Sequence, residues 1–389
     1  EGASVTSLLL SVASLIGFAL ATGQSRGETQ IVISEHLGLT RSDEVVTYPF
    51  SAEKGDCVAS SVRLSGPHGL HACQLSDVTL WPGTDFVKSA KLSFVVAQLE
   101  PLTTQAYTVS VSPTPAVRNA KTDLKLATGS GPTASIAEAT TAKFGVRLLI
   151  GEESYTPAAV AAKVPGPLQG MRLADGTWFG GSHMFGSIPI TSYSGRIIDS
   201  GPVFVRARCQ YTYADGNRLE VTTRLSTRVA ELIFETEVTR QQPNDGWDLR
   251  LTPGLPALTL QFPREAAGKQ SGAKTIENSS WLERPIHAYA PGTLTSLSPW
   301  GDWWDEYTQP DVYLVFAEGR RELALVRHDP ERWVLPVERG DAPFGYFQKK
   351  TIPLIKETDG SIALRVNNAA GARTWSVSEG DDPEAVSYT

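Results

Sequence analysis

The residues best suited to chemistry in this sequence are histidines, tyrosines and arginines near aromatic or glycine-rich stretches. His287 and Tyr289 are two positions apart, so on an extended segment their side chains point the same way. An imidazole and a phenol on one face can share proton transfer, as general acid–base catalysis requires. Arg284 lies just upstream, where its guanidinium could bind a carboxylate. The alternative is a half-exposed strand without a chemical role, in which the arginine makes only surface contacts.

A second candidate for proton transfer is His183, which lies in the glycine-rich stretch TWFGGSHMFGS. Trp178, Phe179 and Phe185 surround it in the sequence. Glycine lets a backbone approach a ligand closely, and an aromatic ring next to a histidine suits a sugar subsite. The alternative is a glycine-rich loop that holds a packed histidine.

The stretch SPWGDWWDEY at 298–307 combines three tryptophans, a tyrosine and three acids. A proline and a glycine interrupt it, so it is predicted to be a loop. Indole faces beside carboxylates suit a ligand with apolar faces and hydroxyl groups, which is a description of a sugar. The candidate ligand contacts are Trp300, Asp302, Trp303 and Trp304. The alternative is an aromatic plug between two sheets.

Clustered acids in the same stretch are also oxygen ligands of the kind that Ca²⁺ takes, and Asp302, Asp305 and Glu306 are the residues concerned. Calcium is the only cofactor that the sequence suggests. No C-x-x-C, H-E-x-x-H or EF-hand pattern occurs, so we expect no metal site built from local sequence.

The clearest strand pattern lies between 201 and 240. Alternate residues share one apolar face: Val203, Val205, Ala207, Cys209, Tyr211 and Tyr213. Arg206 and Arg208 are on the opposite, polar face, where they could meet an acidic saccharide. The alternative is a solvated face on which they bridge to Glu220 or Glu235. The tetrapeptide ADGN at 214–217 predicts a hairpin turn.

Short β-branched and aromatic runs between Gly, Pro, Asn and Asp recur along the rest of the chain, and few segments support a long helix. We therefore predict an all-β protein. A small N-terminal β-barrel or sandwich is expected at 29–114, followed by a large antiparallel supersandwich at 135–377. Polar faces of such long strands can line an open groove.

The charge and the ends of the sequence restrict its partners and its compartment. A net charge of −7 without a Lys/Arg-rich block excludes nucleic acid and anionic membrane surfaces as expected partners. The apolar run Ser7–Ala21 predicts a signal peptide at 1–21, or alternatively an N-terminal membrane anchor. Either places the remainder outside the cytoplasm, secreted or periplasmic. Cys57 and Cys73 could pair there and leave Cys209 single, or all three could be buried thiols.

Several short patterns resemble carbohydrate-active families. LGLTRSDEVVTYPF and LEPLTTQAYTVSV resemble parts of the β-domain that follows the catalytic domain of family 38 α-mannosidases. DSGPVFVRARCQYTY looks like the leading strand of a galactose-mutarotase-type supersandwich. A small β-domain, then a supersandwich, then R-x-W at 373–375 resembles PcRGLX-type rhamnogalacturonan exo-lyases. The resemblance covers most of 29–377 and implies a polysaccharide-active protein, but it transfers no catalytic residue.

The same residues admit two kinds of chemistry on a polysaccharide. A lyase that acts on uronic acids needs a group to neutralise the sugar carboxylate, a base and an acid, for which His, Tyr and Arg are suitable. A glycoside hydrolase needs two carboxylates. We expect a polysaccharide-degrading enzyme that acts on a plant- or algal-type acidic polysaccharide or oligosaccharide, with a lyase favoured over a hydrolase. The alternative is a non-catalytic carbohydrate-binding or scaffold part of a larger enzyme, with a further domain after residue 389.

Overall fold

The computed structural model describes residues 28–115, 122–131 and 134–250, and after residue 250 a series of strands that ends at Gly380. Among these residues there is no α-helix, and the two short 3₁₀ helices are η2 (Ala59–Ser61) and η3 (Ala161–Lys163). The predicted all-β class is confirmed. No helix in the described part is long and apolar enough to cross a membrane. The expected signal peptide at 1–21 lies outside the described residues.

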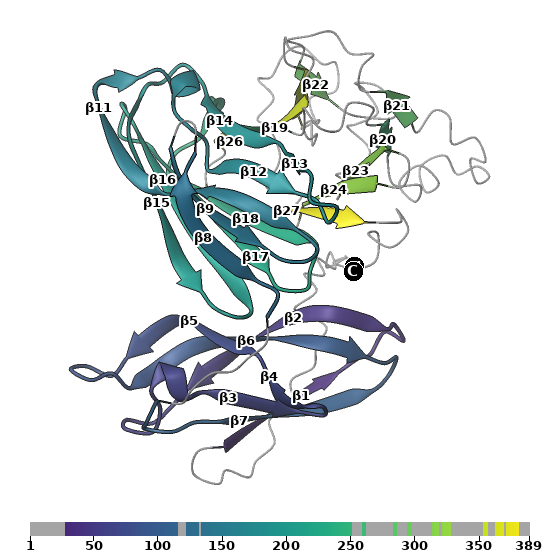
Figure 1. Cartoon of the computed structure of the whole chain (residues 1–389). Helices are drawn as coiled ribbons and strands as arrows, with labels where there is room; N and C mark the ends of the chain where they lie inside the picture. The colour runs from purple at the N-terminus through teal and green to yellow at the C-terminus, as the bar shows by residue number, and fades with distance from the viewer. Residues whose placement is uncertain are drawn as a thin grey trace, which may run out of the picture. The chain divides into compact units, whose positions relative to one another are not determined.

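The chain divides into two compact units (Figure 1). The first contains residues up to Leu124 together with Asp199–Val205 and Ser226–Val229. It has two antiparallel sheets. The first sheet has the order β1 (Glu28–Ser34), β7 (Thr104–Ser110), β3 (Arg63–Gly66) and β4 (Gly69–His71). The second has the order β2 (Arg41–Ser51), β6 (Val87–Leu99) and β5 (Cys73–Leu80).

The core of the first unit is a single apolar cluster to which both sheets contribute. Ile31 and Ile33 come from β1, and Leu92 and Phe94 from β6. The alternating pattern of β1 and β7 explains this arrangement, because every second side chain of each strand is buried. The small unit is therefore a β-sandwich with its own hydrophobic core.

The three cysteines are buried and form no disulfide, so the alternative of three buried thiols is confirmed and the pairing of Cys57 with Cys73 was wrong. Cys57 Sγ lies 3.5 Å from the Val58 carbonyl oxygen, and Cys73 Sγ lies 3.8 Å from the Val62 carbonyl oxygen. Both thiols pack in the core of the first unit as small apolar groups. Sequence spacing suggested proximity but could not give the direction of the two Cβ atoms, on which a disulfide depends.

The second unit is built on a ten-stranded antiparallel sheet. Its C-terminal strand lies in the middle, between strands from the two halves of the unit. The order is β11 (Gly151–Ala159), β15 (Ile190–Ser200), β16 (Phe204–Tyr213), β17 (Arg218–Ser226), β18 (Glu231–Val238), β27 (Gly371–Gly380), β24 (Arg321–Arg327), β23 (Tyr313–Glu318), β20 (Thr259–Gln261) and β21 (Glu283–Pro285).

The hairpin of β16 and β17 follows the predicted alternation. All six residues of the predicted apolar face of 203–213 are buried. The turn closes through hydrogen bonds from Tyr213 N–H to the Asn217 carbonyl and from Gly216 N–H to the Tyr213 carbonyl. Gly216 adopts φ +81°, which the turn requires and which costs glycine little.

The described residues of the second unit also form two five-stranded sheets. One has the order β13 (Trp178–Phe179), β12 (Leu168–Arg172), β10 (Gly145–Leu149), β9 (Ser135–Thr140) and β8 (Lys125–Ser130). The other has the order β14 (Gly181–Phe185), β19 (Gln242–Arg250), β26 (Ile362–Asn368), β25 (Pro353–Lys356) and β22 (Leu294–Ser296). Met184 N–H donates to the Val164 carbonyl and Gly166 N–H to the Ser182 carbonyl, so the segment before β12 runs beside β14.

Three fully buried aromatic rings join the ten-stranded sheet to the sheet that contains β14, β19 and β26. Phe234 on β18 stacks on Trp375 of β27 with the ring centroids 4.1 Å apart. Trp247 on β19 lies 5.8 Å from Phe234 and 5.7 Å from Trp375, again between centroids. Rings of this size bury much apolar surface, so the cluster fixes one face of β19 against the large sheet.

Candidate functional site

Most of the predicted catalytic and ligand-binding residues lie outside the part that the structure describes. These are His287, Tyr289, Trp300, Asp302, Trp303 and Trp304. The backbone of Arg284 is part of β21, where it pairs with Leu260, but its side chain is not described. The predicted calcium loop lies in the same undescribed stretch. Within the described residues no group of three or more His, Cys, Asp and Glu side chains could hold a metal ion.

The arginines on the polar face of β16 take part in an ion network across the large sheet. Arg208 Nε lies 2.9 Å from Glu220 Oε1, as the structural alternative predicted. On the next strand, burial lowers the pKa of the Arg224 guanidinium, Glu235 and Glu231 raise it, and Arg206 lowers it further. Charges of both signs thus lie close together on this face.

His183 lies in a charged row that crosses three neighbouring strands. In the strand register, His183 of β14 is opposite Asp248 of β19, and Asp248 is opposite Arg365 of β26. The adjacent row, Met184, Trp247 and Val366, is fully buried, and Trp247 reaches the aromatic cluster. Because side chains alternate along a strand, the charged row lies on the face opposite to this core.

The geometry of the row is set by the buried carboxylate of Asp248, whose side chain is 1% exposed. Arg365 donates from Nε to Oδ1 at 2.9 Å and from Nη2 to Oδ2 at 2.8 Å. His183 Nε2 lies 3.7 Å from Oδ2, which is an ion-pair distance when the imidazole is protonated. The planar guanidinium also lies over the ring of Phe185, 3.8 Å from its centroid. The bidentate pair holds Asp248 in one orientation beside the imidazole.

The charges of this row determine what His183 can do. A lone buried carboxylate would hold a neighbouring imidazole in its protonated form. Arg365 supplies the opposite charge at both oxygens of Asp248, so the pair has no net charge. The histidine side chain is 25% exposed, and its Nδ1 atom is buried. A ligand can therefore exchange a proton with His183 only through Nε2, the nitrogen that faces Asp248.

Local backbone features set the position of the row. Between Gln242 and Gly246 the register of β19 against β26 shifts by a β-bulge. In the bulge, the buried Asp245 accepts a 2.9 Å hydrogen bond from Ile188 N–H, beyond the end of β14. A Cβ atom on Gly246 would meet the Val366 carbonyl oxygen, so only glycine fits there.

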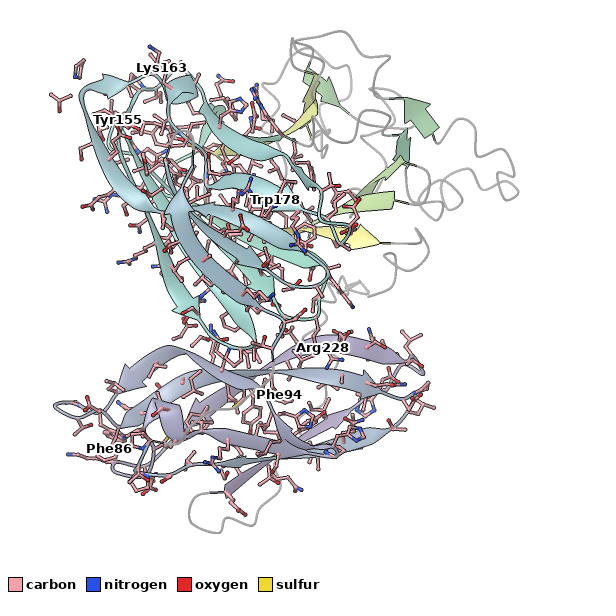
Figure 2. The ribbon with its side chains drawn as sticks, in the orientation of Figure 1. Phe86, Phe94, Tyr155, Lys163, Trp178 and Arg228 are labelled. Carbon is pink, nitrogen blue, oxygen red and sulfur yellow. The ribbon has the colours of Figure 1, made fainter. Side chains whose placement is uncertain are left out.

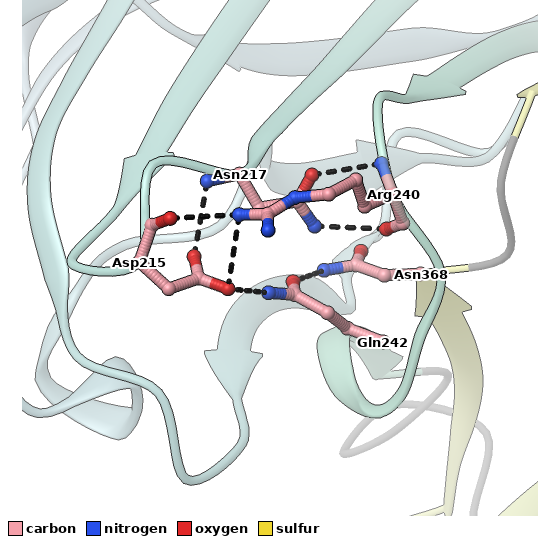
Figure 3. Close-up of polar contacts among 5 residues, drawn as sticks. All are labelled: Asp215, Asn217, Arg240, Gln242 and Asn368. Atoms are coloured by element: carbon pink, nitrogen blue, oxygen red, sulfur yellow. Dashed lines mark hydrogen bonds and ion pairs between the residues drawn. The ribbon is translucent and has the colours of Figure 1, made fainter.

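A polar network holds the strand ends next to the bulge (Figure 3). Asp215, in the β16–β17 turn, accepts hydrogen bonds from Gln242 Nε2 at 2.8 Å and from Asn217 N–H at 3.0 Å. Gln242 Oε1 in turn accepts a bond of 3.2 Å from Asn368 Nδ2. Asn217 and the backbone of Arg240 exchange two further bonds, of 2.8 and 2.9 Å. Because the Asp215 carboxylate only accepts, each amide in this chain has one allowed orientation.

The structure brings together only part of the predicted His183 site. Phe185 lies on the same face as His183, two residues along β14. Trp178 and Phe179 belong to β13 in the other five-stranded sheet. The chain passes between the two sheets at Gly180 and Gly181, with φ +70° and +120°. The two glycines therefore allow the chain to cross between the sheets, and the close approach of their backbone to a ligand stays a prediction.

Asp248 and Arg365 were missed at the sequence level, although each shows a signal. Asp248 stands between Trp247 and Leu249, and Arg365 stands between Leu364 and Val366. A charge between two apolar residues on a strand indicates a polar row opposite a buried one. The two residues are 117 positions apart, so their pairing depends on the sheet topology.

Comparison with known proteins finds similar solved structures but no similar sequence. No known protein family matches the sequence, and no curated protein is similar to it. Two similar solved structures come from Enterococcus faecalis: an alpha-mannosidase of strain V583, with a TM-score of 0.47, and a protein of glycosyl hydrolase family 38, with a TM-score of 0.49. Each is 10% identical to this chain and aligns with 93% of it. The chain spans only 44% and 45% of their lengths, and neither match shows the resemblance to rhamnogalacturonan exo-lyases. Scores of this size assign no activity.

Proposed function

We propose that this chain belongs to a carbohydrate-active protein that acts on an acidic saccharide, with His183 as its proton-transfer residue. The observation that carries the proposal is the row His183–Asp248–Arg365. In this row a partly exposed imidazole lies beside a carboxylate whose charge is balanced by the Arg365 guanidinium. Such an imidazole can take up a proton and release it again. The Arg365 side chain is 24% exposed, and its Nη1 makes no hydrogen bond to another described residue, so this nitrogen suits an anionic ligand.

These groups favour β-elimination over hydrolysis. Hydrolysis would need two carboxylates that flank the glycosidic bond, and in the described row Asp248 is the one carboxylate and is ion-paired. In elimination, His183 removes the proton next to the uronate carboxylate, and the electron pair forms the ring double bond as the bond to the glycosidic oxygen breaks. The resulting imidazolium can return its proton to the departing oxygen. Arg365 Nη1 would bind the uronate carboxylate and stabilise its developing charge.

Activity against polymers tests this proposal. Polygalacturonate and alginate would be incubated with the protein, and unsaturated products would be followed by their ultraviolet absorbance. We expect product from the wild type and a loss of at least about 100-fold in His183→Ala, because general base catalysis contributes at least that factor. Tyr155→Phe, at the edge strand β11, is the matched control and should keep its rate. Reducing ends without an unsaturated product would identify a hydrolase instead.

The second candidate is a non-catalytic carbohydrate-binding or scaffold role. It is favoured by the hydrogen bonds that Arg365 donates to both oxygens of Asp248. A bidentate pair with a buried carboxylate is also typical of an ion pair with a purely structural role. Polymer binding that is retained in His183→Ala, without turnover of any polymer by the wild type, would support this role. We also propose export from the cytoplasm, which the apolar segment Ser7–Ala21 supports.

A further inference from the structure

The outer face of the sheet β13-β12-β10-β9-β8 carries a second group of side chains that the row around His183 does not use. One face of this sheet is buried, with Val146, Leu148 and Met171 almost fully inaccessible. The strand register places Glu138, Arg147 and Gly170 in one row on the opposite face. Trp178, labelled in Figure 2, is on the neighbouring strand β13, where it pairs with Arg172. Arg172 is two residues from Gly170 along β12, so Trp178 lies on the same face.

Trp178 is held in place from two sides. Its indole lies next to Gly170, where an added Cβ would be 3.4 Å from ring atom Cε3 and 3.5 Å from Arg147 Cδ. The absence of a side chain at this position lets the ring and the arginine stem lie close to the sheet. The Arg147 guanidinium stacks over the indole, 3.9 Å from the ring centroid. The indole therefore keeps one orientation without a ligand.

Arg147 is also oriented by a carboxylate. Its Nε donates to Glu138 Oε2 at 3.0 Å, and the two side chains are 36% and 38% exposed. Nη1 and Nη2 have no hydrogen-bond partner among the described residues, so they remain available as donors. Glu138 is available as an acceptor beside them. An ordered indole with adjacent donors and an acceptor matches a sugar ring, which has C–H groups on its face and hydroxyls at its rim.

We propose that Trp178, Arg147 and Glu138 form a second saccharide-binding surface, which takes a pyranose ring of the polymer at a distance from the proton-transfer site. The Arg147 guanidinium covers the centre of one indole face, so the sugar would pack against the part of the indole that the guanidinium leaves open. Hydroxyls of the sugar would bind Arg147 Nη and the Glu138 carboxylate. This inference rests on the proposed function, because the same polymer would occupy both places. It predicts that long chains bind more tightly than short ones, since a short chain engages one surface only.

Binding to polymers in native gels tests the surface. Retardation would be measured in gels that contain polygalacturonate or the neutral polymer galactomannan, for the wild type, Trp178→Ala and Trp178→Phe. We expect about tenfold weaker binding in Trp178→Ala and a smaller loss in Trp178→Phe, which keeps an aromatic face. Trp81→Ala is the control, because Trp81 is also a partly buried indole with a cation, Lys88 Nζ, 5.4 Å from its ring centroid.

The outcomes separate this surface from the proton-transfer site. Turnover of a short oligosaccharide should be unchanged in Trp178→Ala and lost in His183→Ala. If the wild type degrades a polymer but Trp178→Ala binds it as tightly as Trp81→Ala does, the surface is refuted and the proposed function stands. If the wild type neither binds nor degrades any of the polymers, both inferences fail.

Discussion

Removal of the Arg365 guanidinium should destabilise the second unit strongly, because it leaves the Asp248 carboxylate buried without compensation. In Arg365→Met both oxygens of Asp248 lose these donors, and the nitrogen that remains closest in the row is His183 Nε2, at 3.7 Å from Oδ2. Breaking a buried pair costs about 3–5 kcal/mol. We expect about 3 kcal/mol, the low end, because the Arg365 side chain is 24% exposed and water can reach the gap. For a unit of this size, that lowers the melting temperature by roughly 10 °C.

Urea unfolding followed by tryptophan fluorescence would measure this loss. The matched control is Arg147→Met, which removes a pair that is 36% and 38% exposed and should cost at most about 1 kcal/mol. The double variant Asp248→Asn/Arg365→Met should recover most of the stability, since no charge remains buried. A loss in Arg365→Met equal to that of Arg147→Met would refute the reasoning.

Two further predictions concern groups outside the row. Burial opposes the ionisation of Glu35, but hydrogen bonds from the N–H groups of Leu102, Leu37 and Gly38 keep its pKa below the ordinary value of 4.5. A carboxyl group whose pKa is lower in the folded protein stabilises the fold above pH 4.5, and this stability is lost as the pH falls through the folded-state pKa. The free energies of unfolding of wild type and Glu35→Gln should therefore converge in acid. A constant difference between the two curves at all pH values would contradict this. Burial raises the pKa of the Cys209 thiol to about 12, so iodoacetamide at about pH 8 should label this thiol only after unfolding. Mass spectrometry would measure the labelling. Rapid labelling of Cys209 in the native protein would exclude the buried environment.

The sequence predicted the fold where one strand pattern was long enough to define both faces. Along β16 the alternation from Val203 to Tyr213 gave the buried face, and the ADGN turn gave the partner strand. The pattern also offered the ion pair between Arg208 and Glu220 as one of two interpretations. Such features are local, because a hairpin brings together residues that are close in the sequence.

The candidate site was only partly predictable, because its residues come from distant strands. His183 was recognised from its glycine-rich surroundings, but those glycines serve the crossing of the chain from β13 to β14. Asp248 and Arg365 meet because β26 returns beside β19 after more than a hundred residues. Alternation predicts the face of a residue on its own strand, but it does not predict which strand will be the neighbour.

The β-bulge in β19 connects the local sequence to this long-range arrangement. Gln242 is opposite Asn368 and Gly246 is opposite Asn367, so three residues of β19 have no partner on β26 between these two pairs. A slip of one residue at this point would move Arg365 from the charged row to the face of Trp247, where the aromatic core leaves no room for a cation. The amide chain from Asp215 through Gln242 to Asn368 holds the register on one side of the bulge, and Gly246 holds it on the other. The alignment of His183, Asp248 and Arg365 therefore depends on Gly246 and on the amide chain, which lie outside the row. For this reason the three residues of the row do not by themselves predict the site.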